Sequence, residues 1–462
     1  MFFYFLNYIS PAWYFNLSPK KDYAPYLIDC DLLSEEEKQI VLFDSNFSSE
    51  YISKLDAAYQ AFQKGIIKID KKYALASSDV LPSLCDEYYF IRKYYKSFWA
   101  IYILIIRMAT FHNPLKELAA FIKTRNTKKV NVYQTTYNYP EYENFNSPLL
   151  ASNPFITIII PTLNRYAYLK DVLMDLAAQD YKHFEVIIID QSDPFDESLY
   201  LSLNPNPNLN LNLNLNLNLN LNLQIIRQKE KALWLARNTG VKMAKGDYLL
   251  FYDDDSRVDS DWIAQHIKAL DFFKVDISSG VSLSVVGAKV PENYSFFRWS
   301  DQIDTGNFLI KKAVFKTTGL FDRQFEGQRM GDAEFGMRCY LNGSTNVSNP
   351  FAKRVHLKVS EGGLRQMGSW DAFRPKKLFS PRPIPSVNYY VRKYFGTKNG
   401  ILNLLISVPS SIMPYRFKRN RKLMLLGSLI FLLLSPIFIF PLIKSWKKST
   451  LMLNKTTKIK FI

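Results

Sequence analysis

The chain has 462 residues, of which 22% are charged and 15% aromatic, and its formal net charge is +17 at pH 7. This length allows two or three domains, each with a sizeable hydrophobic core. The positive charge favours anionic partners, such as nucleotide phosphates, nucleic acid or an acidic membrane face. The three cysteines are far apart and odd in number, which excludes a disulfide framework and a zinc-binding spacing and fits a reducing cytoplasm.

Residues 1–150 carry no motif that indicates chemistry, and we expect a helical accessory region of unknown role. The aromatic segment 1–9 lacks a basic stretch and a small-residue cleavage site, so a signal peptide is not predicted. The apolar run 98–106 is too short to span a bilayer. It is expected to form a buried helix or a helix at a membrane surface.

From residue 155 onward, apolar runs alternate with stretches of helical periodicity. This pattern is typical of an α/β domain with a mostly parallel, Rossmann-like sheet and helices on both faces. The expected strands are residues 156–160, 184–189, 224–227 and 248–252.

A low-complexity segment, residues 203–223, separates the second and third predicted strands and alternates strictly between Leu and Asn from Leu209. A single repeated dipeptide specifies no unique strand register, so we interpret it as an expanded loop. Its alternative is an aggregation-prone strand. Deletion of residues 209–222 is expected to leave activity largely intact.

Three consecutive aspartates, Asp253 to Asp255, follow the strand predicted at 248–252. Ligands of α/β sheets bind at the carboxyl ends of the strands, and clustered carboxylates suit Mg²⁺ or Mn²⁺. The alternative role is capping of the next helix, but residues 259–261 already supply that cap. The sequence therefore predicts a divalent cation site.

Two more polar features follow the early strands. The turn after the first strand contains Pro161, Thr162, Asn164 and Arg165, and the second strand ends at Asp190. Adjacent parallel strands would bring both features into one crevice with the aspartates, which indicates a sugar-nucleotide pocket.

Read together, several segments resemble the family 2 glycosyltransferases with the GT-A fold, among them bacterial cell-surface polysaccharide glycosyltransferases. The resemblance covers about half of the chain, roughly residues 155–370, and does not reach the N-terminal region. The matching segments are residues 155–165, 186–193, 235–240, 245–255, 331–338 and 341–343.

On the donor side, the resemblance implies that Asp190 contacts the nucleotide base and that Arg237 helps to hold the nucleotide. Asp253 and Asp255 would form the D-x-D motif, with Asp255 on the metal and Asp253 nearer the ribose. A cation there would stabilise the departing nucleoside diphosphate. A charge on a helix surface is the alternative reading of Arg237.

On the acceptor side, the resemblance implies that Asp332 is the catalytic base of an inverting reaction. Many relatives have a glutamate just before this aspartate, where Gly331 stands here, and Glu334 is a candidate substitute. Helix capping is the alternative role of Asp332.

Two further residues come from the same resemblance. His356 would complete the metal site, although a lone histidine is more often structural. Arg365 follows the pair Gly362 and Gly363 and would approach phosphate from a loop over the donor.

Residues 381–462 are predicted to form a basic, membrane-associated helical tail. Its apolar segment 423–443 has 21 residues without a charge, enough to span a bilayer as a transmembrane helix. Because of Pro436 and Pro441, a bent or re-entrant element is the alternative to a spanning helix. The segment has positive flanks on both sides, so the sequence does not predict its orientation in the membrane. We expect the protein at the cell membrane, with its catalytic domain on the cytoplasmic side.

The sequence thus predicts a metal-dependent glycosyltransferase that moves a sugar from a nucleoside-diphosphate sugar to a lipid-linked or polysaccharide acceptor. Its domain would span residues 151–380, with a nucleotide-sugar half up to residue 275 and an acceptor half from residue 276. The alternatives are a catalytically silent membrane scaffold and a nucleotidyltransferase, which usually has a glycine-rich phosphate loop. Nucleic acid is not expected as a partner, because the basic residues concentrate beside the apolar tail.

Overall fold

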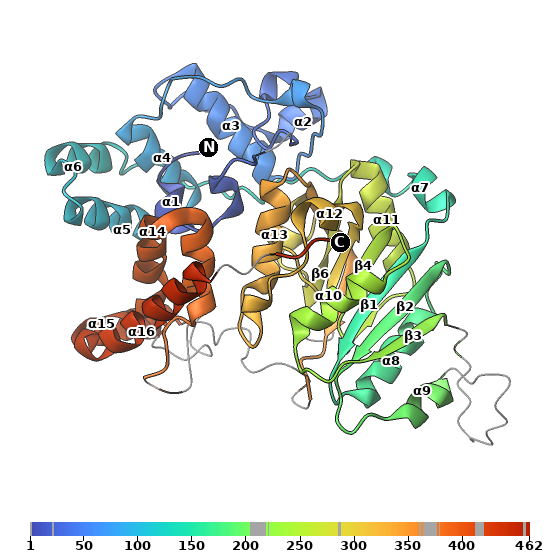
Figure 1. Cartoon of the computed structure of the whole chain (residues 1–462). Coiled ribbons are helices and arrows are strands. Elements are labelled where there is room, and N and C mark those ends of the chain that lie inside the picture. The colour runs from blue at the N-terminus through green and yellow to red at the C-terminus, as the bar shows by residue number, and fades with distance from the viewer. Residues whose placement is uncertain are drawn as a thin grey trace. The chain divides into compact units, whose positions relative to one another are not determined.

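The structure is a computed structural model of the chain, and it divides into two compact units (Figure 1). The first unit comprises Met1–Tyr139, Phe296–Asp301 and Val391–Ile439, and the second comprises Pro140–Ser295, Gln302–Tyr390 and Phe440–Ile462. The described residues are 2–20, 23–203, 219, 221–284, 288–359, 362–363, 377, 379–411, 420–455 and 459–462.

The first unit is helical, as expected for the N-terminal region. Its N-terminal segment is held inside the unit, because the backbone N–H groups of Tyr4 and Phe5 donate to the carboxylate of Glu87 at 2.8 and 2.9 Å. Burial raises the pKa of Glu87 to about 7. The helices are α1 (Leu6–Ile9), α2 (Glu35–Ile40), α3 (Glu50–Gln63), α4 (Leu84–Tyr94), α5 (Ser97–Ala109) and α6 (Pro114–Lys123), followed late in the chain by most of α14 (Pro385–Ser410) and by α15 (Arg421–Leu433).

The second unit is built on a mixed sheet with the strand order β3-β2-β1-β4-β8-β6-β9-β5. The first four of these run parallel, as the sequence predicts. The rest is mixed, because β8 runs antiparallel to both β4 and β6, and β5 runs antiparallel to β9. The strands of this unit are β1 (Ile156–Thr162), β2 (Phe184–Asp190), β3 (Leu223–Arg227), β4 (Tyr248–Tyr252), β5 (Ser256–Val258), β6 (Ile277–Leu283), β8 (Asn307–Lys311) and β9 (Asn346–His356). The short strand β7 (Arg298–Trp299) belongs to the first unit.

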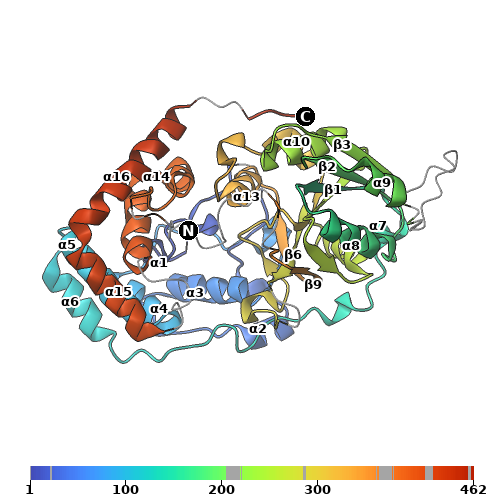
Figure 2. The same cartoon turned by 90° about the horizontal axis from the view of Figure 1, so that it is seen from below.

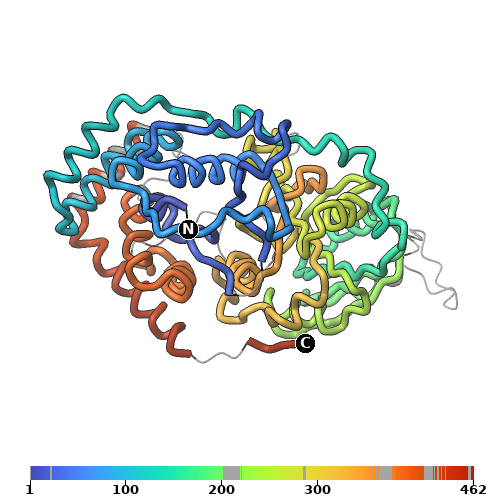
Figure 3. The backbone as a smooth tube through the Cα atoms, turned by 90° about the horizontal axis from the view of Figure 1, so that it is seen from above, coloured from blue at the N-terminus to red at the C-terminus, as the bar shows by residue number. Residues whose placement is uncertain are grey.

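Helices cover both faces of this sheet, and Figure 2 shows α8 and α10 on opposite sides of β1 and β2. Gly240 on α10 permits close packing, because a Cβ atom there would lie 2.5 Å from the Cγ2 atom of Ile159. The tube of Figure 3 traces the chain through both units. The helices of the second unit are α7 (Pro148–Ala151), α8 (Tyr166–Ala177), α9 (Glu197–Leu203), α10 (Leu233–Met243), α11 (Trp262–Phe273), α12 (Ala313–Thr318), α13 (Gly331–Leu341) and most of α16 (Ser435–Asn454).

The Leu-Asn segment lies largely outside the described residues, but its last part belongs to the sheet. Leu221 is buried, and the backbone carbonyl of Asn222 accepts a 2.8 Å hydrogen bond from the N–H of Val186. The third strand also begins one residue earlier than expected, at Leu223. The expanded-loop interpretation therefore cannot include residues 221–223, and a deletion that spares the sheet has to end before them.

The apolar segment 423–443, for which the sequence allows one spanning helix or a bent or re-entrant element, does not form one continuous helix. It is divided between α15 and α16, and Pro436 lies in the first turn of α16, where a missing N–H costs no hydrogen bond. Among the residues that the structure describes, no helix is both long and apolar enough to cross a bilayer.

Candidate active site

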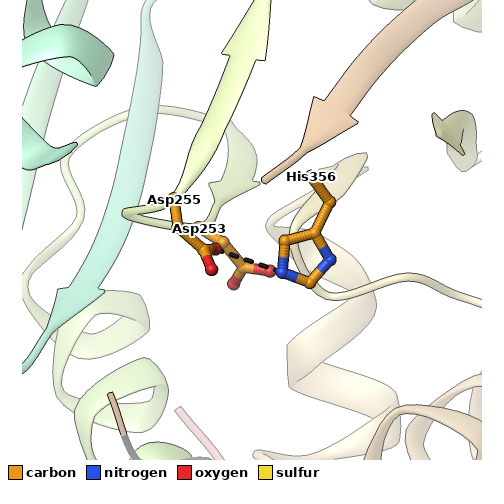
Figure 4. A group of neighbouring side chains, drawn as sticks. All are labelled: Asp253, Asp255 and His356. Carbon is orange, nitrogen blue, oxygen red and sulfur yellow. Dashed lines mark ion pairs between the residues drawn. The ribbon is translucent and has the colours of Figure 1, made fainter. Parts of the chain in front are cut away.

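The aspartates follow β4 directly, and His356 reaches them from the far end of the domain sequence. His356 is the last residue of β9, and the antiparallel pairing of β5 with β9 places it opposite Ser256. Asp253, Asp255 and His356 each offer a ligand atom, and these atoms lie within 4.8 Å of one another. Figure 4 shows the three side chains converging, with an ion pair drawn between Asp255 and His356.

The donor atoms of this group fit a divalent cation. The Nε2 atom of His356 lies 3.1 Å from Oδ1 of Asp255. The other carboxylate oxygen, Oδ2, is buried and accepts no hydrogen bond within the described part of the chain, although Nη1 of Arg165 lies 3.1 Å away. Such a buried, unsatisfied carboxylate oxygen suits a cation, and two carboxylates with one imidazole are acceptable ligands for Mg²⁺ or Mn²⁺.

The carboxylate of Asp255 is held in its charged form. Burial and the nearby charge of Asp253 would raise its pKa, but the hydrogen bond with His356 and the positive charge of Arg165 outweigh them and lower the pKa. Asp255 is therefore available as an anionic ligand at neutral pH.

Asp253 lies between two arginines. Nη2 of Arg237 is 3.0 Å from its Oδ1 atom, and Nη1 of Arg354 is 2.8 Å from its Oδ2 atom. Burial opposes the charge of Asp253, but the guanidinium groups of Arg354 and Arg237 lower its pKa well below the usual range. Arg237 thus contacts the cluster and is not a charge on a helix surface.

Sequence reasoning missed Arg354. Its Nη2 atom lies 2.9 Å from both carboxylate oxygens of Asp304, and its Nε atom donates to Ser282 at 2.7 Å. The carboxylates of Asp304 and Asp253 raise its pKa against the effect of burial. The alternation of side chains along a strand could have indicated Arg354. Residues two apart in β9 point to the same face, and His356 follows Arg354 by two residues.

The middle aspartate, Asp254, is hydrogen-bonded to the end of β1 and to the turn that follows it. Its carboxylate accepts hydrogen bonds from Oγ1 of Thr162 at 2.8 Å and from Nη1 of Arg165 at 2.9 Å. Burial raises its pKa to about 6. Pro161 is still part of β1, where it pairs with Ile189 of β2. Thr162 and Arg165 are therefore tied to the acidic cluster.

Asn164 joins the ends of β1 and β2. It adopts a left-handed conformation with φ 52°, which asparagine tolerates. Its N–H donates to Oγ of Ser192 at 2.7 Å, and its Oδ1 atom accepts from the N–H of Asp193 at 3.1 Å. Its hydrogen bonds therefore link the turn after β1 to the end of β2, where Asp190 lies.

Asp190 ends β2 and is completely buried. Its Oδ2 atom accepts from the hydroxyls of Tyr166 and Tyr200 at 2.9 and 2.8 Å, and its Oδ1 atom accepts from the N–H of Ser192 at 2.8 Å. A carboxylate oxygen accepts about two hydrogen bonds. Oδ2 therefore has both acceptor positions filled, whereas Oδ1 accepts one hydrogen bond from the described residues.

Asp332 lies in the first turn of α13, whose N-cap is Met330, so Asp332 is not the cap. Its carboxylate accepts one hydrogen bond, from the N–H of Ala333 at 2.8 Å. Burial and the nearby charge of Asp304 raise its pKa, while the hydrogen bond from Ala333 and the charges of Arg237 and Arg329 oppose the rise. Asp332 therefore belongs to the electrostatic surroundings of the cluster.

The two neighbours of Asp332 have structural roles. A Cβ atom on Gly331 would lie 2.2 Å from Cζ2 of Trp234, so the indole occupies the space that a glutamate would need. Glu334 is fully buried and accepts from Nε of Arg338 at 3.0 Å with both oxygens. Glu334 forms this ion pair within α13, which argues against its proposed role as a substitute for the missing glutamate.

Arg365 lies outside the described residues, but the glycines before it contact the turn after β1. The N–H of Gly363 donates to the carbonyl of Leu163 at 2.7 Å. A Cβ atom on Gly363 would lie 2.5 Å from Cζ of Arg165, and the backbone of Gly363 has a positive φ of 71°. Glycine is required at this position for both reasons.

The parallel half of the sheet carries a group of polar and charged side chains at its carboxyl edge, where α/β proteins bind ligands. Residues 157–321 match the family model described as Glycosyl transferase family 2. This part of the chain is therefore a family 2 glycosyltransferase domain.

Two curated relatives each match about two fifths of the chain. It is 29% identical over 199 residues to a PGL/p-HBAD biosynthesis glycosyltransferase of Mycobacterium tuberculosis, a match that covers 41% of this chain and 71% of the relative. It is 25% identical over 180 residues to the glycosyltransferase AglE of Haloferax volcanii, covering 38% of this chain and 55% of AglE.

Solved structures show a more distant likeness. TarS residues 1–349 of S. aureus, in complex with UDP-GlcNAc, is 18% identical with a TM-score of 0.37, covering 64% of this chain and 81% of that structure. The mannosyltransferase PcManGT of Pyrobaculum calidifontis, in complex with GDP-Man and Mn²⁺, is 15% identical with a TM-score of 0.39. This match covers 69% of this chain and 93% of PcManGT. This chain spans 44% of the longer TarS structure.

Gly306 offers a test of the Asp253 and Arg354 pair. A Cβ atom at this position would lie 2.1 Å from Oδ2 of Asp253 and 2.2 Å from Nη1 of Arg354. We expect Gly306→Ala to displace both side chains and to weaken Mn²⁺ binding about 10- to 100-fold, as changes next to metal ligands usually do. Titration calorimetry with Mn²⁺ measures this, and unchanged affinity in a folded variant would contradict the expectation.

Proposed function

We propose that this protein is a metal-dependent, inverting glycosyltransferase that moves a sugar from a nucleoside-diphosphate sugar to a lipid-linked or polysaccharide acceptor at the cytoplasmic face of the cell membrane. The observation that carries the proposal is the group of Asp253, Asp255 and His356, with ligand atoms within 4.8 Å at the carboxyl edge of the sheet. The buried, unsatisfied Oδ2 atom of Asp255 supports a cation there.

On the donor side, Asp253, Asp255 and His356 would hold Mg²⁺ or Mn²⁺. A bound cation supplies Lewis-acid stabilisation of the negative charge that develops on the departing diphosphate. Arg165 and Arg237, which pair with the aspartates, add positive charge beside the same position. Asp190 and Asn164 shape the edge of the crevice where the base would lie.

On the acceptor side, Asp332 would act as the general base. The acceptor hydroxyl oxygen forms a bond to the anomeric carbon while its proton passes to the carboxylate of Asp332. The bond from the anomeric carbon to the diphosphate oxygen breaks, and the nucleoside diphosphate leaves from the opposite face. One displacement of this kind inverts the configuration. The raised pKa of Asp332 strengthens it as a base.

A membrane-bound acceptor is supported by the composition of the C-terminal tail. The basic segment 416–422 ends in the first turn of α15, and α15 and α16 leave large apolar side chains exposed. Among these, Leu433 and Phe440 are the most exposed, at 80% and 70%. Lipid carriers that bear sugars present a similar combination of anionic and apolar groups.

A donor screen tests the proposed function. The purified chain is titrated with UDP-, GDP- and dTDP-sugars in the presence of Mn²⁺ or Mg²⁺, and the release of nucleoside diphosphate is followed. We expect one donor class to bind and to be hydrolysed slowly, only with the cation. The control for the metal-ligand variant Asp255→Ala is Asp79→Ala, since Asp79 is an exposed carboxylate in the first unit. Absence of binding by every donor would contradict the proposal.

A further inference from the structure

Helices α5 and α6 of the first unit form a helical hairpin that the glycosyltransferase domain does not include. Figure 1 shows them as two adjacent helices joined by a short turn. The hairpin has a rigid base, because the buried carboxylate of Glu117 on α6 accepts from Nε of Arg107 on α5 and from the hydroxyl of Tyr88 on α4, both at 2.8 Å. Its outer side chains therefore have fixed positions.

The outer side of α5 is a stripe of exposed apolar side chains. Phe98, Ile101, Ile105 and Met108 are all exposed, whereas Ala100 and Ile103 are buried. The exposed residues follow one another at intervals of three, four and three, which places them on one face of a helix. This face is apolar, and its four side chains are 38–60% exposed.

Helix α6 continues the pattern. Leu115, Leu118 and Ile122 are exposed at intervals of three and four, while Glu117 and Ala120 are buried. The two helices therefore present apolar residues from both arms of one hairpin. Exposed apolar groups in such a contiguous arrangement mark binding surfaces in soluble domains.

The tip of the hairpin is the most exposed apolar residue of the described chain. Phe111 is 98% exposed and adopts a left-handed backbone conformation with φ 60°. Aromatic residues rarely adopt this conformation, and here no burial of the ring offsets its cost. An exposed phenylalanine held in this way is suited to insertion into an apolar partner.

The charges around the hairpin are almost all positive. Residues 96–129 contain seven basic residues and one acidic residue, and that acid is the buried Glu117, which is paired with Arg107. The exposed basic side chains form no ion pair with a carboxylate of the described residues. They are Lys96, Lys116, Lys123, Arg125, Lys128 and Lys129.

From these observations we propose that the α5–α6 hairpin is a membrane-docking element that inserts Phe111 and the apolar side chains of both helices into an anionic phospholipid surface. Amphipathic helices that bind membranes combine apolar aromatic and aliphatic residues with Lys and Arg, and lie at the boundary between headgroups and acyl chains. The basic residues 123–129 follow α6 directly and would contact the phosphates.

A bilayer fits this surface better than a protein partner does. The interfaces of protein complexes are depleted in lysine at their centres, whereas here four lysines and an arginine lie within and beside α6. Lysine stems can lie along the apolar surface while their ammonium groups reach the phosphates. The inference gives the first unit a role in holding the proposed enzyme at the membrane, and it rests on the proposed function only for the location of the acceptor.

Vesicle binding tests the inference without any donor, so its failure can be distinguished from failure of the proposed function. The full chain is sedimented with vesicles of phosphatidylcholine alone or with about a third phosphatidylglycerol. We expect binding to the anionic vesicles and its loss as salt is raised, because salt screens the basic residues. No binding to anionic vesicles would overturn the inference.

Matched double variants assign the binding to the hairpin. Phe111→Ser with Leu115→Ser is expected to weaken vesicle binding at least about tenfold, because two large apolar side chains no longer insert. The control is Met174→Ser with Met243→Ser, two apolar residues of the second unit that are 42% and 44% exposed. The control is expected to bind as the unaltered chain does, and thermal melting checks that both variants are folded.

Two outcomes would point to other occupants or surfaces. If Leu433→Ser with Phe440→Ser abolishes binding while the hairpin variant binds normally, the C-terminal helices bind the membrane and the inference is wrong. If light scattering shows a dimer that the hairpin variant dissociates without any change in vesicle binding, the face joins two copies of the chain and the inference is also wrong. Reduced preference for anionic vesicles in Lys123→Gln with Arg125→Gln and Lys128→Gln would support it.

Discussion

Replacing Asp332 by asparagine is expected to lower kcat by about 10²–10⁴-fold, the usual contribution of a positioned general base. The amide can still accept the hydrogen bond from the N–H of Ala333, so the turn at the start of α13 should keep its structure. The Kd of the donor should change little, because Asp332 makes no ion pair with Arg237 or with the metal-ligand group in the described part of the chain. Single-turnover kinetics and donor titration measure the two effects separately.

The pH profile gives an independent check of the same role. A base is active when deprotonated, so the rate falls as pH decreases through its pKa. Burial and Asp304 raise the pKa of Asp332, so this acid limb should lie at a higher pH than for an ordinary aspartate. The limb should persist in Asp332→Glu and disappear in Asp332→Asn. A limb that remains unchanged in Asp332→Asn would assign the titration to another group.

Replacing Asp255 by alanine is expected to lower kcat/KM by at least about 10³-fold, because a metal ion can supply several kcal/mol of charge stabilisation in the transition state. The variant also leaves His356 and Arg165 without their shared carboxylate partner. Mn²⁺ binding, measured by electron paramagnetic resonance, should be lost in parallel. Chelation of the metal from the unaltered chain should reproduce the loss of activity, and added Mn²⁺ should restore it.

A matched variant separates metal binding from support of the turn. Asp254 lies next to Asp255 in the sequence, but its carboxylate accepts from Thr162 and Arg165. Asp254→Asn should therefore retain Mn²⁺ binding and mainly lower thermal stability, by about 1–3 kcal/mol for a weakened buried hydrogen-bond pair. Equal loss of Mn²⁺ in Asp254→Asn and Asp255→Ala would show that the metal assignment is wrong.

The parallel half of the sheet could be predicted because its signals are local. Each strand is a short apolar run followed by a polar turn, and the structure places β1, β2, β3 and β4 within two residues of the predicted bounds. The position of Asp253 to Asp255 at the end of β4 follows from the same pattern. A possible transmembrane helix over residues 423–443 was predicted from the same kind of signal, but hydropathy does not report the break before Ser435 that divides this segment between α15 and α16.

The remaining contacts of the candidate site depend on pairings between distant segments. The strand period places Arg354 on the same face as His356, but no local pattern indicates that it lies 2.8 Å from Asp253, about a hundred residues earlier. Tyr200 reaches Asp190 because α9 follows β2, and Trp234 fills the space beside Gly331 because α10 and α13 approach each other. Such contacts follow from packing, which periodicity and motif spacing do not encode.

The sequence by itself determined the α/β class, the four parallel strands and the acidic cluster at the end of β4, because these depend on apolar periodicity and on residues adjacent in the chain. Only the tertiary structure decided how that cluster is completed. The antiparallel pairing of β5 with β9 places His356 beside Asp255 and Arg354 beside Asp253. The physical reason is that charges and ligands act over a few ångströms in space, and strand pairing sets those distances between segments far apart in the chain.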